Sequence, residues 1–469
     1  MENSNGYILN IDKKSVWEYR KNDKKLNIFA EEYKNFISIA KTERRTIDCC
    51  VKTAKQKGFV DIDEVILSGK KLKKGDKVYK LNRGKGAAFF FIGSEPFNFG
   101  IKVIAAHTDT PRLDLKPRPL YEDNGLAMLD THYYGSIKKY QWTTIPLSLH
   151  GIVIKKDGSL VDINIGEDVN EPVFYISDLL IHLAEEQMQK PLFKGIEGED
   201  LNIILGNMPF GDCNFDDRVK YNILNILYEK YGIIEEDLIF AEIEAVPAGT
   251  ARDAGLDRSM IASYGQDDRL GVYSAFRALL DSNNEEKTKA LLLVDKEETG
   301  NFGSTGAKSK FFEYALFEIL ELTSGYNEFK LLETLRNSKM LSIDAICAYD
   351  PNYSFAFDIN NSAFLGCGVV LNKYNGVKGK CETNDADIEF LSYLRKIFDE
   401  NDIVWQHAEF GKVDAGGSET ISYILGQYGA QAADISFPLL SMHSPLEVSS
   451  KADIYELYRA CKAFFQSKK

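Results

Sequence analysis

Histidines and acidic residues follow several of the apolar runs in this sequence. His107 comes directly after "VIAA", and His443 lies between an apolar stretch and a proline in "ISFPLLSMHSPLE". Glu297 and Glu298 follow "ALLLVDK" and precede a glycine-rich turn. Each has an ordinary explanation when taken alone, since a lone histidine at a strand end is usually a hydrogen-bonded structural residue. Together they are also residues that could bind metal ions.

Three aspartates bear on the choice between a structural role and a metal site. Asp344 interrupts the otherwise apolar "MLSIDAICA". A carboxylate among apolar neighbours is costly unless it is paired or binds a cation. Asp267 and Asp268 directly precede an amphipathic stretch in "SYGQDDRLGVYSAF", where an aspartate could instead serve as the N-cap of a helix. Asp344 is therefore the residue that a purely structural explanation accounts for least well.

A shared metal site would explain these residues together. Sites in open α/β sheets form outside the carboxyl ends of the strands, so the side chains would meet at one edge if the sheet is parallel there. Two imidazoles and three carboxylates suit zinc, manganese or cobalt better than calcium. The set also suits two ions about 3.5–4 Å apart that share a bridging carboxylate. The candidate ligands are His107, His443, Asp267, Asp344 and a carboxylate of the pair Glu297-Glu298.

The elements that would position these residues are of mixed α/β type. Residues 1 to about 60 have helical apolar spacing, and later runs such as "IKVIAA", "ALLLV" and "LSIDAICA" are typical of buried strands. Between about 118 and 260 the pattern changes to hairpins, with Asp157-Gly158 between two alternating runs. We therefore predict an α/β fold with a mixed, largely parallel sheet flanked by helices and an inserted β-rich second domain. The predicted division is 1–117 and 259–469 for the catalytic domain and 118–258 for the insertion.

Bulk properties exclude several classes of protein. The 469 residues suit two domains, with 44% hydrophobic and 27% charged residues and no apolar run near the roughly 20 residues that span a bilayer. A net charge of -13 argues against a nucleic-acid partner. The seven cysteines contain no CxxC pair, and the N-terminus lacks the pattern of a secretory signal. We therefore expect a cytoplasmic protein that binds neither membranes nor nucleic acids.

Six stretches give the sequence a family resemblance. They are "AAHTDTPRLDLKP", "GQDDRLGVY", "DKEETGNFGSTGA", "SIDAICAYDPNY", "GKVDAGGSETIS" and "LSMHSPLE". In this order they resemble the M18 family of metalloaminopeptidases, the aspartyl aminopeptidase group of the co-catalytic di-zinc exopeptidases. The likeness covers nearly the whole chain, and six short motifs in order are far more specific than any one of them.

The resemblance implies a role for each candidate residue. His107 and Asp344 would hold one ion and Glu298 and His443 the other, with Asp267 bridging them. Glu297 would be the general base, and Asp109 would orient His107, which is a physical reason for the HxD spacing. The peptide bond after the bridging aspartate is typically cis in this clan, so Asp267-Asp268 is expected to be a non-proline cis bond.

The implied activity is removal of the N-terminal residue from peptides with a free amine, with two divalent ions per subunit, zinc first and manganese or cobalt as alternatives. The preferred residue, acidic or neutral, stays open. The resemblance also implies homo-oligomers, in which dimers assemble into a tetrahedral dodecamer and a histidine of the inserted domain reaches a neighbouring active site. His182, on a predicted helix, is the candidate, and His132 competes with it. The alternative functions are a related di-metal deacylase or carboxypeptidase, or an inactive metal-binding assembly protein.

Overall fold

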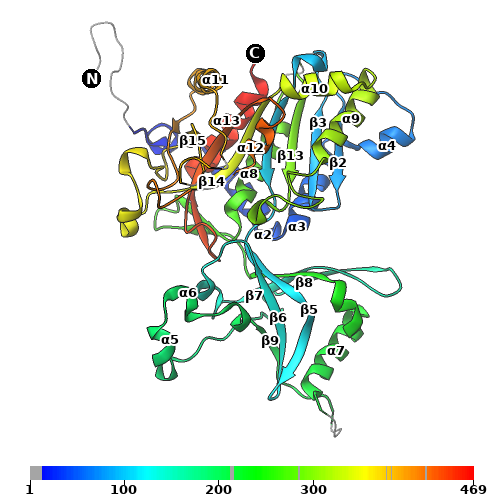
Figure 1. Cartoon of the computed structure of the whole chain (residues 1–469), viewed down its shortest axis with the longest axis vertical. Coiled ribbons are helices and arrows are strands. Elements are labelled where there is room, and N and C mark those ends of the chain that lie inside the picture. Colours follow the sequence, from blue (N-terminus) through cyan, green and yellow to red (C-terminus); the bar gives the residue numbers. More distant parts are fainter. Residues whose placement is uncertain are drawn as a thin grey trace.

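The protein consists of a larger α/β body and a smaller β-rich body, joined where strands β5 and β6 meet the larger one (Figure 1). The computed structural model describes residues 13–211, 216–283, 286–376, 378–381, 383–417 and 420–468. The first twelve residues, on which part of the signal-peptide expectation depends, lie outside this set, as do Ser418 and Glu419 of the fifth matched stretch.

The larger body is built on a sheet of twelve described strands. Ten of them are, in spatial order, β1 (Val60–Asp61), β2 (Lys77–Asn82), β3 (Gly86–Phe91), β13 (Lys289–Val294), β4 (Lys102–His107), β14 (Lys339–Cys347), β17 (Gln431–Leu440), β18 (Glu447–Ser450), β12 (Met260–Ser263) and β11 (Arg252–Ala254). Off this path, β15 (Val369–Asn372) pairs with β16 (Trp405–Gln406) and β17.

The four central strands of this sheet, β13, β4, β14 and β17, are mutually parallel. Val294 pairs with His107 in register, and Asp344 pairs with Ser436. Antiparallel strands flank this block on both sides. The parallel block gives the carboxyl edge that the sequence predicts, and the mixed α/β class is confirmed.

Helices cover both faces of the sheet because its central strands are apolar on both faces. Ile104 and Ala106 of β4 join one core, and Val103 and Ala105 join the other. The first core is covered by α2 (Lys24–Ile39), α3 (Glu43–Gln56), α8 (Gln266–Leu280), α11 (Ile388–Glu400) and α13 (Lys451–Gln466). The second is covered by α4 (Ile62–Leu67), α9 (Phe311–Thr323), α10 (Glu328–Arg336) and α12 (Ser422–Gly426). The short α1 (Val16–Arg20) packs near Val404 and Ala452.

The smaller body has an antiparallel sheet of six described strands. In spatial order they are β8 (Leu160–Ile165), β7 (Leu147–Ile154), β10 (Glu242–Pro247), β5 (Arg112–Asp123), β6 (Leu126–Tyr134) and β9 (Ile203–Gly206). Helix α7 (Arg218–Tyr231) packs on this sheet through apolar side chains. The hairpin predicted around Asp157-Gly158 is confirmed as β7–β8, with Gly158 at φ +83.

The strands of the smaller sheet come from residues 112–247, whereas β11 (Arg252–Ala254) belongs to the larger sheet. The predicted insertion, 118–258, therefore begins inside β5 and ends beyond β11. The division into domains stays a prediction.

One local prediction is wrong. The helix predicted around His182, in "SDLLIHLAEEQ", does not form as one element. Only a 3-10 turn, η3 (Ile181–Leu183), and a short helix, α5 (Glu185–Gln189), form there, followed by α6 (Leu192–Gly195). Most apolar side chains of this segment are exposed, so no core face stabilises a longer helix. Among the described residues, no helix has both the length and the apolar character needed to cross a bilayer.

Candidate metal centre

The candidate ligands lie at or near the carboxyl edge of the parallel block. His107 is the last residue of β4, and Asp344 lies in β14. Glu297 and Glu298 form the turn η6 (Glu297–Thr299) shortly after β13, and His443 follows β17. Asp267 is at the start of α8, which packs against β4 and β14. Two strands, two segments that follow strands and one helix start therefore converge at one place.

The first half of the centre surrounds the imidazole of His107. Its Nε2 atom lies 3.4 Å from Asp267 Oδ1 and 3.6 Å from Asp344 Oδ1. Three ligand atoms lie within 4.8 Å of one another, one from each of His107, Glu297 and Asp344. This half therefore holds one nitrogen and several carboxylate oxygens around a common point.

The second half surrounds His443. Its Nε2 atom lies 3.4 Å from Asp267 Oδ2 and 3.3 Å from Glu298 Oε1. The two oxygens of Asp267 thus face different histidines, Oδ1 facing His107 and Oδ2 facing His443. A carboxylate placed in this way can bridge two cations.

The unsatisfied atoms of the centre show that a cation fits it. Asp267 Oδ1 and Glu298 Oε1 are buried and accept no hydrogen bond from any described residue. Buried acceptors are normally satisfied, so orphaned carboxylate oxygens that face one another need a positive charge. Nitrogen and carboxylate donors together are a set that zinc accepts.

The electrostatics of the side chains agree with this need. Burial, reinforced by neighbouring carboxylates, raises the pKa of Glu298 to about 8 and that of Asp344 to about 7. Burial alone would lower the pKa of His107, but the carboxylates of Asp109, Asp267 and Asp344 raise it well above its ordinary value. The site therefore attracts protons when no metal neutralises it.

Asp267 is not an N-cap. The N-cap residue of α8 is Gly265, and Asp267 and Asp268 have non-helical backbone angles. The peptide bond between these two aspartates is cis, as the resemblance implied. The ordinary explanation for this pair is thus excluded, and the carboxylate of Asp267 is directed at the two histidines instead.

Glu297 and Asp109 lie beside the ligand set. Burial raises the pKa of Glu297 well above its ordinary value. Asp109 is fully buried, and its main-chain oxygen lies 3.0 Å from His107 Nδ1 while its Oδ1 lies 3.4 Å from the same atom. Its carboxylate also accepts the backbone N–H groups of Glu297 and Glu298, both at 3.2 Å. Asp109 therefore contacts both the histidine and the acidic turn.

Sequence reasoning missed the residues that support the ligands. Glu447 accepts the backbone N–H of His443 at 2.8 Å through Oε1 and that of Asp267 at 3.2 Å through Oε2. Asp268 Oδ2 accepts the backbone N–H of His107 at 3.3 Å. Glu447 and Asp268 stand within the matched stretches "LSMHSPLE" and "GQDDRLGVY", which is the signal that could have identified them.

The two histidines weighed for a neighbouring active site lie in the smaller body. His182 is exposed in η3, surrounded by exposed leucine and isoleucine side chains. His132 is exposed on β6, and its Nδ1 lies 2.9 Å from the carbonyl of the adjacent Tyr133. Neither belongs to the ligand clusters of its own chain.

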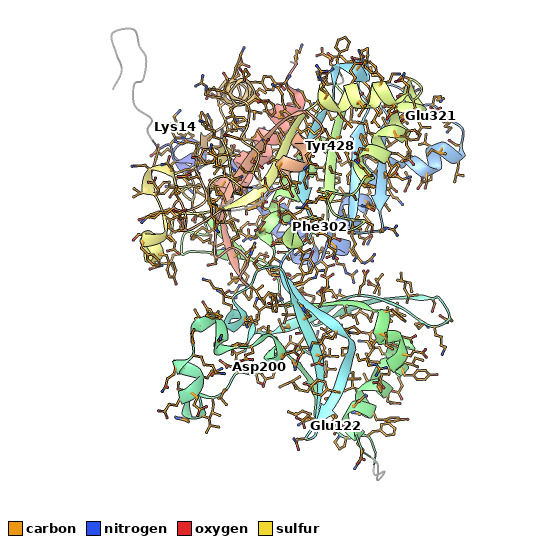
Figure 2. All side chains as sticks on the ribbon, viewed as in Figure 1. Lys14, Glu122, Asp200, Phe302, Glu321 and Tyr428 are labelled. Carbon is orange, nitrogen blue, oxygen red and sulfur yellow. The ribbon has the colours of Figure 1, made fainter. Side chains whose placement is uncertain are left out.

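Figure 2 shows Phe302, four residues past Glu298, on the side of the larger body that faces the smaller body.

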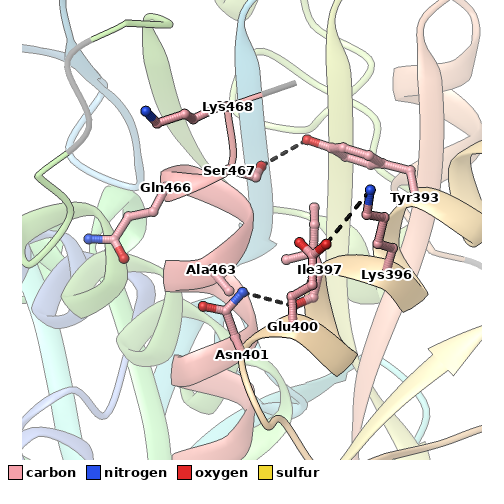
Figure 3. Close-up of a pocket in the computed structure, with 9 residues that line it drawn as sticks. All are labelled: Tyr393, Lys396, Ile397, Glu400, Asn401, Ala463, Gln466, Ser467 and Lys468. Carbon is pink, nitrogen blue, oxygen red and sulfur yellow. Dashed lines mark hydrogen bonds and ion pairs between the residues drawn. The ribbon is translucent and has the colours of Figure 1, made fainter.

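A separate pocket of about 410 Å³ lies between α11 and the end of α13 (Figure 3). Its lining includes Ser467, whose hydroxyl lies 2.8 Å from that of Tyr393. Lys102, the first residue of β4, donates to the carbonyl of Phe464 near this pocket. His107 ends the same strand, roughly 16 Å away at about 3.3 Å per residue. The pocket therefore lies at the opposite edge of the sheet from the metal centre.

Comparison with known proteins places this arrangement among metallopeptidases. Residues 36–465 match the family model described as "Aminopeptidase I zinc metalloprotease (M18)". A probable M18 family aminopeptidase 1 of Clostridium acetobutylicum is 52% identical over 457 residues, which cover 97% of this chain and 98% of that protein. The crystal structure of an M18 aminopeptidase of Thermotoga maritima has a TM-score of 0.93 at 42% identity and covers 98% and 100% of the two chains. A yeast protein solved as a dodecamer shares the fold, with a TM-score of 0.75, 20% identity and 94% and 97% coverage.

Proposed function

This chain belongs to the M18 family of zinc metalloproteases, and from this premise we propose how its residues perform the reaction of an aminopeptidase. The enzyme hydrolyses the N-terminal residue from peptides, and neither the deacylase and carboxypeptidase alternative nor the inactive-scaffold alternative is favoured. The observation that carries the mechanism is the position of Asp267, whose two oxygens each lie 3.4 Å from a different histidine.

Two divalent ions per chain would occupy the two halves of this centre. His107 and Asp344 would hold one, Glu298 and His443 the other, and Asp267 would bridge them. Zinc is the first choice, in agreement with the family description, and manganese or cobalt would suit the same donors. When bound, such ions polarise the scissile carbonyl and acidify the attacking water.

The protein's own groups would move the protons. Glu297 would take the proton of the attacking water and deliver it to the leaving amine, because its carboxylate lies beside the His107 half of the centre. Asp109 would hold the imidazole of His107 and the backbone of Glu297 in place. The free α-amine of the peptide would bind near the acidic groups, which restricts cleavage to chain ends.

A metal analysis combined with a blocked substrate tests this mechanism. We expect two zinc ions per chain and hydrolysis of aminoacyl arylamides with a free amine, whereas the N-acetylated forms of the same arylamides should stay intact. A single ion per fully active chain would contradict the two-ion mechanism. Equal cleavage of the acetylated substrates would contradict recognition of the amine.

We also propose that the smaller body, predicted as residues 118–258, is a dimerisation and lid domain of a homo-oligomer. Its segment from Leu179 to Phe193 exposes a cluster of apolar side chains: Leu179, Leu180, Ile181, Leu183, Met188, Leu192 and Phe193, each at least 46% exposed. Contiguous exposed apolar surface of this kind is typical of interfaces. The occupant we propose is a second copy of this chain, with dimers assembling into a tetrahedral dodecamer.

His182 lies in the middle of this apolar segment. A second copy docked there would bring His182 close to the partner's surface, so we propose it as the histidine that completes a neighbouring active site. We propose a cytoplasmic location as well, because the six described cysteines are unpaired, as expected in a reducing compartment.

A further inference from the structure

Asp109 connects more parts of the active site than its position after His107 suggests. Its Oδ1 accepts from Glu297 N and its Oδ2 from Glu298 N, both at 3.2 Å. Oδ1 also lies 3.4 Å from His107 Nδ1. The orientation of this one carboxylate therefore affects the base Glu297 and two ligands, His107 in one half of the centre and Glu298 in the other. Glu297 and Glu298 both belong to the turn η6.

The shortest hydrogen bond to this carboxylate comes from the smaller body. Tyr134, the last residue of β6, donates its hydroxyl to Asp109 Oδ2 at 2.7 Å. The Tyr134 side chain is nearly buried, at 8% exposure. Two cations lie over its ring, Arg112 at 3.9 Å and Lys296 at 5.0 Å from the centroid. Packing of this kind holds the phenol in one orientation.

The residues after Tyr134 contact the other half of the centre. The carbonyl of Ser136 lies 3.0 Å from His443 Nδ1 and can accept its proton. Gly135, at φ +73, leaves just enough room for its neighbours, since an added Cβ would lie 3.4 Å from Glu298 Cβ and 3.2 Å from Pro111 Cγ. Residues 134–136 thus support both halves of a centre whose ligands all come from the larger body.

We propose that Tyr134 is a positioning residue for peptide hydrolysis, which acts by holding the carboxylate of Asp109 against the backbone of Glu297 and Glu298 and the ring of His107. The proposal depends on the function proposed above. Without the hydroxyl, the Asp109 carboxylate loses the donor that selects its rotation, and its hold on Glu297 weakens. The loss should affect the rate of the chemical step more than the binding of the peptide.

Tyr134→Phe tests this role because it removes one oxygen and keeps the aromatic ring that Arg112 and Lys296 contact. We expect kcat for an aminoacyl arylamide to fall about 10–100-fold, with KM changed by less than about 3-fold at saturating zinc. Tyr458→Phe is the matched control. Tyr458 donates to Asp281 Oδ2 at 2.8 Å, so it makes the same type of bond at the C-terminal end of α8, whereas the ligand Asp267 lies at the start of this helix. The kcat of this variant should stay at the wild-type value.

A double-mutant cycle with Asp109→Asn shows whether Tyr134 acts through Asp109. If it does, adding Tyr134→Phe to Asp109→Asn should lower kcat no further. Wild-type kcat in the single Tyr134→Phe variant, or multiplicative losses in the double variant, would overturn the proposal. Failure of the underlying function would look different, since the wild-type enzyme itself would then bind no zinc or cleave no arylamide. Thermal midpoints of all variants identify any loss that comes from misfolding.

Discussion

Adjacent glutamates in η6 have different surroundings although they share a turn. Glu298 Oε1 lies 3.3 Å from His443 Nε2, and Glu298 also has a ligand atom within 4.8 Å of His107 and Asp267. Glu297 instead has a ligand atom within 4.8 Å of His107 and Asp344. In the proposed mechanism Glu298 binds an ion and Glu297 moves a proton. The two roles can be separated by the same substitution at neighbouring positions.

Glu297→Gln should lower kcat about 10²–10⁴-fold and leave two zinc ions bound, because the amide cannot accept the proton of the attacking water. Glu298→Gln should instead lower the zinc content, since a neutral amide is a weaker ligand. Elemental analysis and arylamide kinetics on both variants check this. An active Glu297→Gln enzyme would remove Glu297 as the base.

Asp434 in β17 is another buried carboxyl, and it makes the stability of the protein depend on pH. It lies at 1% exposure and accepts the hydroxyls of Thr420 at 2.8 Å and Ser422 at 2.7 Å. Burial raises its pKa to about 6. Because the folded pKa exceeds the unfolded one, the fold favours the protonated form, and this contribution to stability is lost as pH rises through about 6.

Asp434→Asn should therefore become more stable relative to wild type as pH rises. The whole effect is about 3 kcal/mol, of which roughly half falls between pH 5 and pH 8. Thermal midpoints of both proteins at these pH values measure it. A constant difference between Asp434→Asn and wild type would contradict the raised pKa.

At the scale of elements, the centre depends on how closely α8 approaches β14. Gly271 of α8 allows this approach, because a Cβ at this position would lie 2.6 Å from Ile343 Cγ2 and 2.2 Å from Asp268 Oδ1. Ile343 precedes the ligand Asp344, and Asp268 follows the bridging Asp267. The distance between the ligands Asp267 and Asp344 therefore depends on the absence of a side chain at Gly271.

Gly271→Ala should push α8 away from β14 and weaken the site. Overpacking of this kind costs about 1–3 kcal/mol of stability, and we expect weaker zinc binding in titrations with a competing chelator as well. Gly195→Ala in α6 is the control, since no atom lies within 4 Å of its added Cβ. Unchanged zinc affinity in a less stable Gly271→Ala protein would show that the contact supports the fold alone.

At the scale of the whole molecule, the smaller body presents the apolar segment that we assign to self-association. Leu183→Asp and Phe193→Asp, at 67% and 69% exposure, should each shift the mass measured by light scattering toward the single chain. A charge buried in an interface without a partner opposes assembly. Leu67→Asp in α4 of the larger body, at 87% exposure, should leave the mass unchanged. A single-chain mass in the wild-type protein would contradict the oligomer.

Mixing subunits tests the proposed place of His182. If His182 completes the site of a neighbour, His182→Ala alone and Glu297→Gln alone should both be slow. Mixed oligomers of the two should regain activity, because some sites then combine an intact Glu297 with an intact His182. Activity equal to the sum of the separate variants would place His182 outside the neighbouring site.

The sequence alone determined the features that depend on local pattern and on motif chemistry. Apolar runs predicted the central strands. His107 and the pair Glu297-Glu298 at predicted strand ends were expected to meet Asp267, Asp344 and His443 at one edge, because parallel strands bring their carboxyl ends together. The matched stretches indicated the family, which the comparisons confirm. The hairpin around Asp157-Gly158 was predictable because its turn residues and alternation are local.

Only the tertiary structure decided the features that depend on contacts between distant segments. The helix predicted around His182 does not form because no core lies beneath it, which a local pattern cannot reveal. The contact of Tyr134 with Asp109 joins the end of β6 in the smaller sheet to the loop that follows β4, and Glu447 of β18 contacts Asp267. Such contacts are set by the packing of whole elements, and spacing along the chain carries no information about them.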